Sequence, residues 1–446
     1  MKQNRYLIYG LSKSGEAAFN LIFNKKDKFY LYDDDKQKRK IFYEKTQNLY
    51  NVFLLNKIEK VIVNFVDTII ISPGVSIYNP IIEYAKRKKI EIISELELGF
   101  RFCKNKMIAI TGTNGKTTTV SLLYDIFKTA GFNVEKVGNI GNPLSSVVRK
   151  VKRKSILICE VSSFQLEAIN KFNPQFSGIL NITTDHIDRH KTFENYKKTK
   201  YKIFKNLNKK VKVVLNQNLK VLSLRQNKNQ IYKFGFKKCE NGCYVDKENI
   251  IYSKNNKEEV ICCLSDVNSL RGNHNLENIM ACICFAKFFK IKNKYILEAI
   301  KNFKNISHRI QKIYQTAKNS FYDDSKATNI DATIKAINSF NEDVFLILGG
   351  SDKGYSYDEI FKSLPQKVKD VVACGETANK ICKTASKYNI KIKAFKNLKE
   401  ATIFACENLK EGQSLLLSPA SASFDEFKNY KDRGEKFLNY IKEFYE

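Results

Sequence analysis

Short apolar runs alternate with segments of helical length along almost the whole chain. Such runs predict strands buried on both faces, and the helices between them predict parallel sheets with right-handed crossovers. The runs fall into three groups: Tyr6–Tyr9, Phe29–Tyr32 and Thr68–Ile71; Met107–Ile110, Ile156–Cys159, Gly178–Asn181 and Val211–Leu215; and Val344–Leu348, Val371–Ala373 and Ser414–Leu417. Because 446 residues exceed one ordinary core, we predict an α/β fold with three domains.

Domain boundaries are predicted near Cys103 and near Ile306, where one group of runs gives way to the next. The domains are then residues 1–103, 104–306 and 307–446. Segment Lys237–Val260 is less regular, and we predict that it is a β-rich insertion in the middle domain.

The chain carries 77 Lys and Arg against 46 Asp and Glu, a formal net charge of +31. This excess of positive charge could bind nucleic acid or an anionic membrane, but the lysines are spread along the chain instead of gathered into one stripe. We therefore predict no nucleic-acid partner and no membrane partner. A nucleic-acid-binding ATPase is the alternative from another class, and it would require a clustered basic face.

Eleven cysteines and four histidines lack the paired C-x-x-C spacing of zinc knuckles, so we expect free thiols in a reducing compartment. No run reaches the ~20 apolar residues of a membrane span. The N-terminus turns polar at Ser12, unlike a signal peptide. We expect a cytoplasmic protein that is a monomer.

The strongest local motif is Met107–Thr118, which reads as a strand, a loop of small residues and a helix that begins near Lys116. Backbone N–H groups at a helix N-terminus can wrap a polyphosphate, with Lys116 as a point charge and Thr117 on Mg²⁺. The ordinary phosphate-loop spacing does not fit, because Ile110 stands where its first glycine belongs. A glycine turn without a ligand is the alternative.

Lys200 lies in the middle of a predicted apolar helical face. The helix is expected at Glu194–Leu207, and its apolar face holds Phe193, Tyr196, Ile203, Phe204 and Leu207, with Lys198, Lys202 and Lys205 opposite. A buried lysine has a lowered pKa, and its neutral amine can react with CO₂ to form a carbamate. The alternative is a side chain that extends to the surface.

Segment Thr111–Thr118 resembles the ATP loop of the muramyl ligases and the folylpolyglutamate synthases. Later segments match the muramyl ligase family in the same order: Gly138–Gly141, Glu160–Gln165, Asn181–His190, and Gly272–Asn275 followed by Asn278, His308 and Arg309. The resemblance implies a Rossmann-like first domain, a phosphate-loop-type ATPase domain in the middle, and a Rossmann-like last domain. It also implies an ATP-dependent ligase of peptidoglycan precursor synthesis in the cytoplasm of a bacterium.

The resemblance assigns residues to the ATP site. It implies that ATP is bound by Gly112, Thr113, Asn114, Gly115, Lys116, Thr117, Thr118, Asn275, Asn278, His308, Arg309, Asp324 and Lys326. Two Mg²⁺ ions would be held by Thr117, Glu160, His186 and a carbamylated Lys200. The implied catalytic residues are Lys116, His186 and Lys200, and His186 would orient an acyl phosphate.

The last third of the chain is similar to the D-glutamate-adding branch of the family. The similar segments are Asp323–Asn329, Leu348–Lys353, Leu417–Asp425 and Arg433–Gly434. They imply that D-glutamate is bound by Thr328, Lys353, Ser423 and Tyr430 and is added to UDP-N-acetylmuramoyl-L-alanine. Ser421 and Tyr430 depart from the Cys and Phe that are frequent there. Another muramyl or folylpolyglutamate-type ligase, the alternative within the class, would lack the Ser325–Thr328 sequence.

The first domain carries Gly10–Gly15 after its first strand, which is close to the dinucleotide pattern G-x-G-x-x-G except at Ser12. Alone, this motif would favour a dehydrogenase. In the family the same region binds the UDP part of the substrate. The implied contacts are Lys13, Ser14, Asp34, Asp35, Ser72 and Gly74, together with Asn139 from the middle domain.

Overall fold

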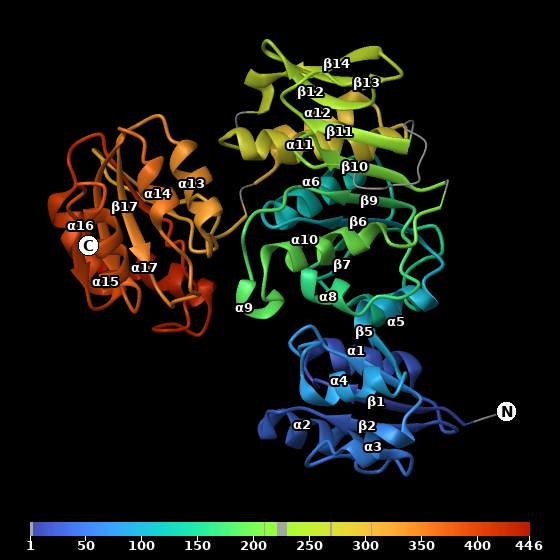
Figure 1. Cartoon of the computed structure of the whole chain (residues 1–446). Helices are drawn as coiled ribbons and strands as arrows, with labels where there is room; N and C mark the ends of the chain where they lie inside the picture. The colour runs from blue at the N-terminus through green and yellow to red at the C-terminus, as the bar shows by residue number, and fades with distance from the viewer. Residues whose placement is uncertain (1–2, 209, 221–229, 268–269, 305) are drawn as a thin grey trace. The chain divides into compact units, whose positions relative to one another are not determined.

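The computed structural model describes residues 3–208, 210–220, 230–267, 270–304 and 306–446 (Figure 1). The chain divides into two compact units: Met1–Ile182 with Thr192–Asp266 and Glu277–Ile300, and Thr183–Lys191 with Val267–Leu276 and Lys301–Glu446. The described strands form two sheets in the first unit and one in the second. This arrangement confirms the predicted three-domain α/β class, whereas the exact domain boundaries stay predictions.

The N-terminal sheet has the strand order β3-β2-β1-β4-β5, and all its strands are parallel. Leu7 and Ile69 pack towards one face, and Ile8 and Ile70 pack towards the other, so the strands are buried on both sides. The elements are β1 Arg5–Tyr9, α1 Lys13–Ile22, β2 Lys28–Tyr32, α2 Lys36–Thr46, β3 Val52–Leu54, α3 Lys60–Phe65, β4 Thr68–Ile71, α4 Pro80–Arg87, β5 Glu91–Ser94 and α5 Glu95–Phe102.

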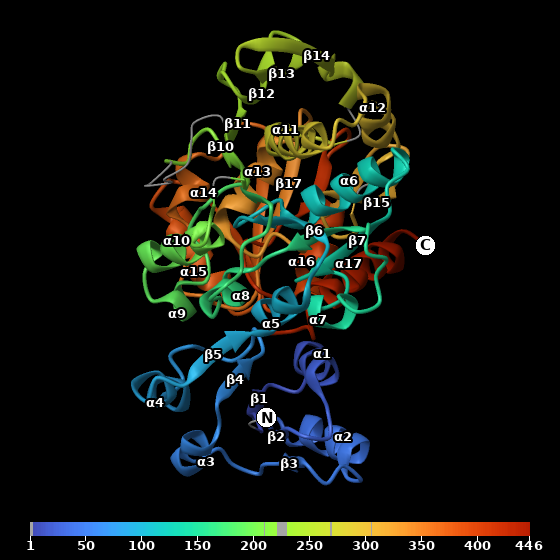
Figure 2. The same cartoon turned by 90° about the vertical axis from the view of Figure 1, so that its right-hand side faces the viewer.

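The middle sheet has the order β14-β13-β12-β11-β10-β9-β6-β8-β7. Its elements are β6 Lys106–Thr111, α6 Lys116–Thr129, β7 Val134–Gly138, α7 Leu144–Val147, β8 Ile156–Glu160, α8 Ser163–Glu167, β9 Phe176–Ile179, α9 Ile187–His190, α10 Phe193–Tyr201, β10 Lys212–Asn216, β11 Ile231–Gly235, β12 Gly242–Asp246, β13 Asn249–Lys254, β14 Lys257–Cys263, α11 Asn273–Phe288 and α12 Asn293–Asn302. Helix α6 lies beside β6 in both views (Figures 1 and 2). The predicted β-rich segment is confirmed, since antiparallel β12, β13 and β14 extend the parallel sheet.

The C-terminal sheet has the order β15-β16-β20-β17-β18-β19, with only β15 antiparallel to its neighbour. Phe345 and Ile347 pack under α16 and α17, whereas Leu346 and Leu348 pack under α13, α14 and α15. The elements are β15 Gln311–Gln315, β16 Ser320–Asp323, α13 Ile330–Asn338, β17 Val344–Gly349, α14 Asp358–Lys362, β18 Val368–Cys374, α15 Ala378–Ser386, β19 Lys393–Phe395, α16 Leu398–Asn408, β20 Ser414–Leu417 and α17 Tyr430–Tyr445.

Helix α5 joins the two sheets of the first unit through a fully buried carboxylate. The Glu97 side chain accepts hydrogen bonds from the backbone N–H groups of Asn170, Lys171 and Phe172 at 2.9–3.0 Å. It also accepts one from Nε of Arg101 at 2.9 Å. A carboxylate is needed here because four donors converge and no donor is required from the side chain.

We expect Glu97→Gln to lower the unfolding free energy of the first unit by about 3 kcal/mol, because the new NH₂ group would face buried N–H donors. The measurement is urea unfolding followed by circular dichroism. Glu91→Gln is the matched control, since Glu91 also pairs with Arg101 but is partly exposed. It should cost less than about 1 kcal/mol. Equal losses in the two variants would contradict the proposed role of the buried carboxylate.

The eleven cysteines are all free thiols, as predicted. Among the described residues, no helix combines the length and apolar character needed to cross a membrane.

Candidate functional site

The predicted phosphate loop joins the end of β6 to the start of α6. Gly115 takes the N-cap position with φ +83°, and a Cβ there would collide with Oδ1 of Asn278. Glycine is therefore required both by the left-handed backbone and by the close approach. Asn278 also accepts a hydrogen bond from Oγ1 of Thr119 at 3.2 Å. The structure thus brings two predicted ATP residues that are far apart in sequence into contact.

A second segment holds the loop from beside β9. The backbone N–H of Thr113 donates to the carbonyl of Asn181 at 3.0 Å, and that of Asn114 donates to Oδ1 of Asn181 at 2.8 Å. The N–H of Leu180 also donates to the carbonyl of Thr111. Strand β9 ends at Ile179, two residues earlier than predicted, and Leu180 and Asn181 bind the phosphate loop instead. Sequence reasoning missed the role of Asn181, although it begins one of the motifs.

Two lysines converge on one carbonyl of the loop. Nζ of Lys116 donates to the carbonyls of Gly112 and Thr113, each at 2.7 Å. Nζ of Lys200 donates to the same Gly112 oxygen at 2.8 Å and lies 4.7 Å from the ring centre of Tyr196. Lys200 is only 1% exposed, so the alternative of a side chain that extends to the surface is excluded. The Lys116 ammonium lies at the helix N-terminus, where a polyphosphate would require positive charge.

The helix that carries Lys200 differs from its prediction. Helix α10 ends at Tyr201 and continues only as a 3₁₀ turn over Lys202–Phe204, not as a helix to Leu207. Phe193 is 36% exposed, so it is not part of the buried face. Lys202 is half-buried and donates to the carbonyl of Glu167 at 2.9 Å, so it does not point away from the core. The change from α to 3₁₀ geometry after Tyr201 alters the direction of the side chains that follow, including Lys202.

Glu160 provides a buried carboxylate at the end of β8. Its Oε2 accepts from Oγ1 of Thr117 at 2.9 Å, and its Oε1 accepts from Nδ2 of Asn139 at 2.8 Å. Among the described residues, no group of three or more His, Cys, Asp or Glu side chains could hold a metal ion. A carboxylate and a hydroxyl still fit Mg²⁺, which often takes one or two protein oxygens and completes its shell with water and phosphate oxygens. Of the four predicted metal residues, His186 belongs to the second unit.

The predicted UDP contacts of the N-terminal domain follow the carboxyl ends of the adjacent strands β2, β1 and β4. Both oxygens of Asp34 accept from the Tyr9 hydroxyl, at 3.0 and 3.1 Å, and Asp35 accepts from the Gln37 N–H to cap α2. Ser72 donates to the carbonyl of Gly10 at 2.8 Å. Lys13 and Ser14 begin α1, and Gly74 lies in the turn after β4. Loops at this edge are where parallel sheets bind ligands.

In the second unit, Asp324 is buried beside β16. It accepts from Oγ of Ser418 at 2.8 Å and from the Ile310 N–H at 3.2 Å, and burial raises the pKa of its carboxyl to about 7. Nδ1 of His308 lies 2.6 Å from the neighbouring Asp323 carboxylate, and Nζ of Lys326 lies 4.1 Å from the Tyr430 ring centre. Arg309 is half-buried next to this group.

Asp185 gathers several predicted residues of the same unit. Its carboxylate accepts from the Tyr355 hydroxyl at 2.6 Å, from Nδ2 of Asn329 at 3.2 Å and from the His186 N–H at 2.9 Å. Nζ of Lys353 lies 3.8 Å from the same carboxylate and donates to the Thr328 carbonyl at 3.3 Å. Ser423 is buried after β20. Sequence reasoning missed Asp185 and Tyr355, for which residue type alone gives no signal.

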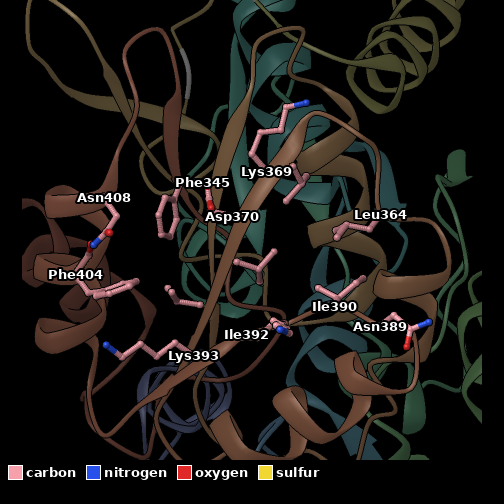
Figure 3. A pocket seen from close by; sticks show the side chains of 14 residues that line it. Phe345, Leu364, Lys369, Asp370, Asn389, Ile390, Ile392, Lys393, Phe404 and Asn408 are labelled. Carbon is pink, nitrogen blue, oxygen red and sulfur yellow. The ribbon is translucent and has the colours of Figure 1, made fainter.

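A separate cavity of about 720 Å³ opens near the amino ends of β18 and β19, opposite the strand ends that carry the predicted site residues (Figure 3). Val368 and Lys393, the first residues of β18 and β19, help to line it, together with the exposed side chains Lys369 and Lys391. None of the predicted site residues lines this cavity.

Family models match three consecutive stretches of the chain. They describe the Mur ligase MurD-like N-terminal domain over residues 4–94, the Mur ligase middle domain over residues 110–286, and the Mur ligase glutamate ligase domain over residues 308–421.

Individual proteins match over nearly the full length. The UDP-N-acetylmuramoylalanine–D-glutamate ligase of Thermoanaerobacter sp. (strain X514) is 41% identical over 452 residues, covering 99% of each chain. The protein of the same name from Caldanaerobacter subterraneus subsp. tengcongensis is 39% identical, covering 98% of each chain. Among solved structures, the MurF ligase from Thermotoga maritima in complex with ADP has a TM-score of 0.60 at 15% identity, covering 100% of this chain and 95% of that one. That likeness concerns the fold.

Proposed function

The chain belongs to the Mur ligase family, and we propose that it is the member that joins D-glutamate to UDP-N-acetylmuramoyl-L-alanine with the use of ATP. The observation that carries this proposal is identity of 39–41% over nearly the whole chain to ligases named for that reaction. The distribution of charge supports it, since Lys116 lies on the phosphate loop and Lys353 lies in the C-terminal unit.

The proposed reaction has two steps. The alanyl carboxylate of the substrate attacks the γ-phosphorus of ATP, which forms an acyl phosphate and releases ADP. The amine of D-glutamate then attacks the acyl carbon, the C–O bond to phosphate breaks, and an amide, inorganic phosphate and a proton are the products. Phosphoryl transfer of this kind depends mainly on positioning and on neutralising charge on the phosphoryl oxygens.

Residues of the first unit fit the ATP half of this reaction. Lys116 and the N-terminus of α6 would bind the β- and γ-phosphates, and Gly115 allows the backbone to approach them. Thr117, Glu160 and a carbamylated Lys200 would hold Mg²⁺, which supplies charge neutralisation when it is bound. Asn139, which donates to Glu160, would keep that carboxylate oriented.

Residues of the second unit fit the amino-acid half. Lys353, Thr328 and Ser423 would bind the two carboxylates of D-glutamate through one cation and two hydroxyls. We expect Lys353→Ala to raise the KM for D-glutamate on the order of tenfold or more, because a carboxylate of the amino acid would lose the charged partner that the half-buried Lys353 provides. Thr328→Ala and Ser423→Ala should raise it less, and none of the three should raise the KM for ATP as much.

The measurement is an ADP-release assay in which each amino acid is offered with UDP-N-acetylmuramoyl-L-alanine. Lys369→Ala is the matched control, because Lys369 is an exposed lysine of the same unit that lines the separate cavity (Figure 3). It should leave the KM for D-glutamate unchanged. A better acceptor among L-alanine and the diamino acids would show that the assignment within the family is wrong.

A further inference from the structure

The C-terminal unit contains a buried arginine that the proposed reaction does not use. Arg433 lies in the first turn of α17 and is only 2% exposed, and burial lowers the pKa of its guanidinium to about 10. Within the described part of the chain, no carboxylate forms an ion pair with it, and its Nε has no hydrogen-bond partner. The carboxylates of Asp425, Asp323 and Asp324 offset this charge only at longer range, and burying a guanidinium without a direct ion pair is costly, so a role beyond helix packing is expected here.

The guanidinium is held by main-chain carbonyls alone. Nη1 donates to the carbonyl of Ala422 at 2.9 Å. Nη2 donates to the carbonyl of Ser325 at 2.8 Å and to that of Ser421 at 3.1 Å. The planar fork therefore bridges two loops, one that follows β16 and one that follows β20. Its geometry suits this task because the two nitrogens present donors in fixed directions.

A third loop reaches the same point. The N–H of Ser351, which follows β17, donates to the carbonyl of Ala422 at 2.9 Å, so this oxygen accepts from both Ser351 and Arg433. Gly350 has φ +136°, and a Cβ there would collide with the Ala422 carbonyl oxygen and lie 3.0 Å from Nη1. The three loops at the carboxyl ends of β16, β20 and β17 thus meet at one guanidinium.

Each of these loops carries one residue proposed to bind D-glutamate. Ser423 directly follows Ala422, Lys353 comes two residues after Ser351, and Thr328 comes three residues after Ser325. The segment from Ser325 to Thr328 is short, and two backbone hydrogen bonds hold it. The N–H of Ala327 donates to the carbonyl of Asp324 at 2.8 Å, and that of Thr328 donates to the carbonyl of Lys326 at 2.9 Å. A shift of the guanidinium would therefore move all three side chains relative to one another.

We propose that Arg433 is a positioning residue that sets the spacing of the amino-acid-binding loops and thereby the affinity for D-glutamate. This inference rests on the proposed function. Arg433 acts through the carbonyls of Ser325, Ser421 and Ala422, and it does not itself touch the amino acid. Removing it should weaken D-glutamate recognition while the ATP loop in the other unit keeps its geometry.

The test is steady-state kinetics of the full chain with Arg433→Lys, Arg433→Met and Gly350→Ala. The KM for D-glutamate should rise on the order of tenfold or more in each variant, because a misplacement of about 1 Å in a binding group has effects of that size or larger. The KM for ATP should rise less than the KM for D-glutamate, because the phosphate loop in the other unit is not altered and only Asp324 and Lys326 of the predicted ATP site adjoin Ser325. Arg433→Lys should give little rescue, because one ammonium cannot bridge the two loops as the fork does.

Phe437→Leu is the control for a loss of stability alone. Phe437 is fully buried one turn further along α17, and it packs on the sheet without contacting the three loops through hydrogen bonds. It should lower the melting temperature but leave the KM for D-glutamate unchanged. The proposal is overturned if Arg433→Lys keeps the wild-type KM, if all KM values rise together, or if Phe437→Leu raises the KM for D-glutamate equally. A wild-type enzyme that does not use D-glutamate would instead refute the proposed function.

Discussion

Replacing Lys116 with alanine is expected to lower the turnover of the ligase by a factor on the order of 10³ or more. Lys116 is the first residue of α6, and its ammonium lies over the loop, where it donates to Gly112 O and Thr113 O. With ATP bound, the same charge would neutralise the oxygens of the transferred phosphoryl group. Alanine removes that charge and also loosens the loop, so both effects act in the same direction.

Two measurements distinguish a loss of turnover from a loss of ATP binding. ADP release at saturating ATP reports turnover, and the ATP-induced rise in melting temperature reports binding by mass action. Lys128→Ala is the matched control, because Lys128 lies in the last turn of the same helix and is exposed. It should leave turnover and the ATP-induced shift unchanged. Near-wild-type ADP formation by Lys116→Ala would remove the assignment of this loop to ATP.

Most inner strands were predictable because apolar runs of three to five residues mark them, whereas edge strands such as β3 and β19 were not predicted. Val344–Leu348, for example, was predicted within one residue of β17, and both faces of that strand are buried. Helix ends were less predictable, as Lys202 shows: a single change from α to 3₁₀ geometry places it against Glu167. Periodicity describes one regular element, and it carries no information on where that element ends.

The candidate site was predictable where a motif contains its own chemistry, as Lys116 and Thr117 do. Contacts between distant segments were not. Asn181 fixes the phosphate loop, and Asp185 gathers Asn329 and Tyr355, through hydrogen bonds that only the folded chain creates. Asp34 is a similar case, since its hydrogen bonds to Tyr9 give it a local role that the position in sequence does not indicate. Its predicted contact with uridine stays a prediction.

Lys200 is expected to be essential as a carbamate and not as an ammonium. The Lys200 side chain is buried, contacts the Tyr196 ring and donates to the Gly112 carbonyl. The Lys116 ammonium donates to the same carbonyl. Burial disfavours a charged amine, and the neutral amine is the form that reacts with CO₂. The neutral amine forms an N–C bond with CO₂ and loses one proton, so two protons are released when the starting form is the ammonium, and a positive charge is replaced by a negative one. A carbamate there would attract Mg²⁺ and Lys116, whereas an ammonium would repel both.

The two forms predict opposite results for conservative replacement. Lys200→Ala should be nearly inactive, and Lys200→Arg should be no better, because a guanidinium keeps the charge but cannot form the carbamate. Acetate should partly restore Lys200→Ala by supplying a carboxylate in the vacated space, and it should not restore Lys200→Arg, where that space is filled. Lys198→Arg, at an exposed position of the same helix, is the matched control and should keep full activity. A fully active Lys200→Arg enzyme would show that the positive charge is what the site requires, and the carbamate would have to be abandoned.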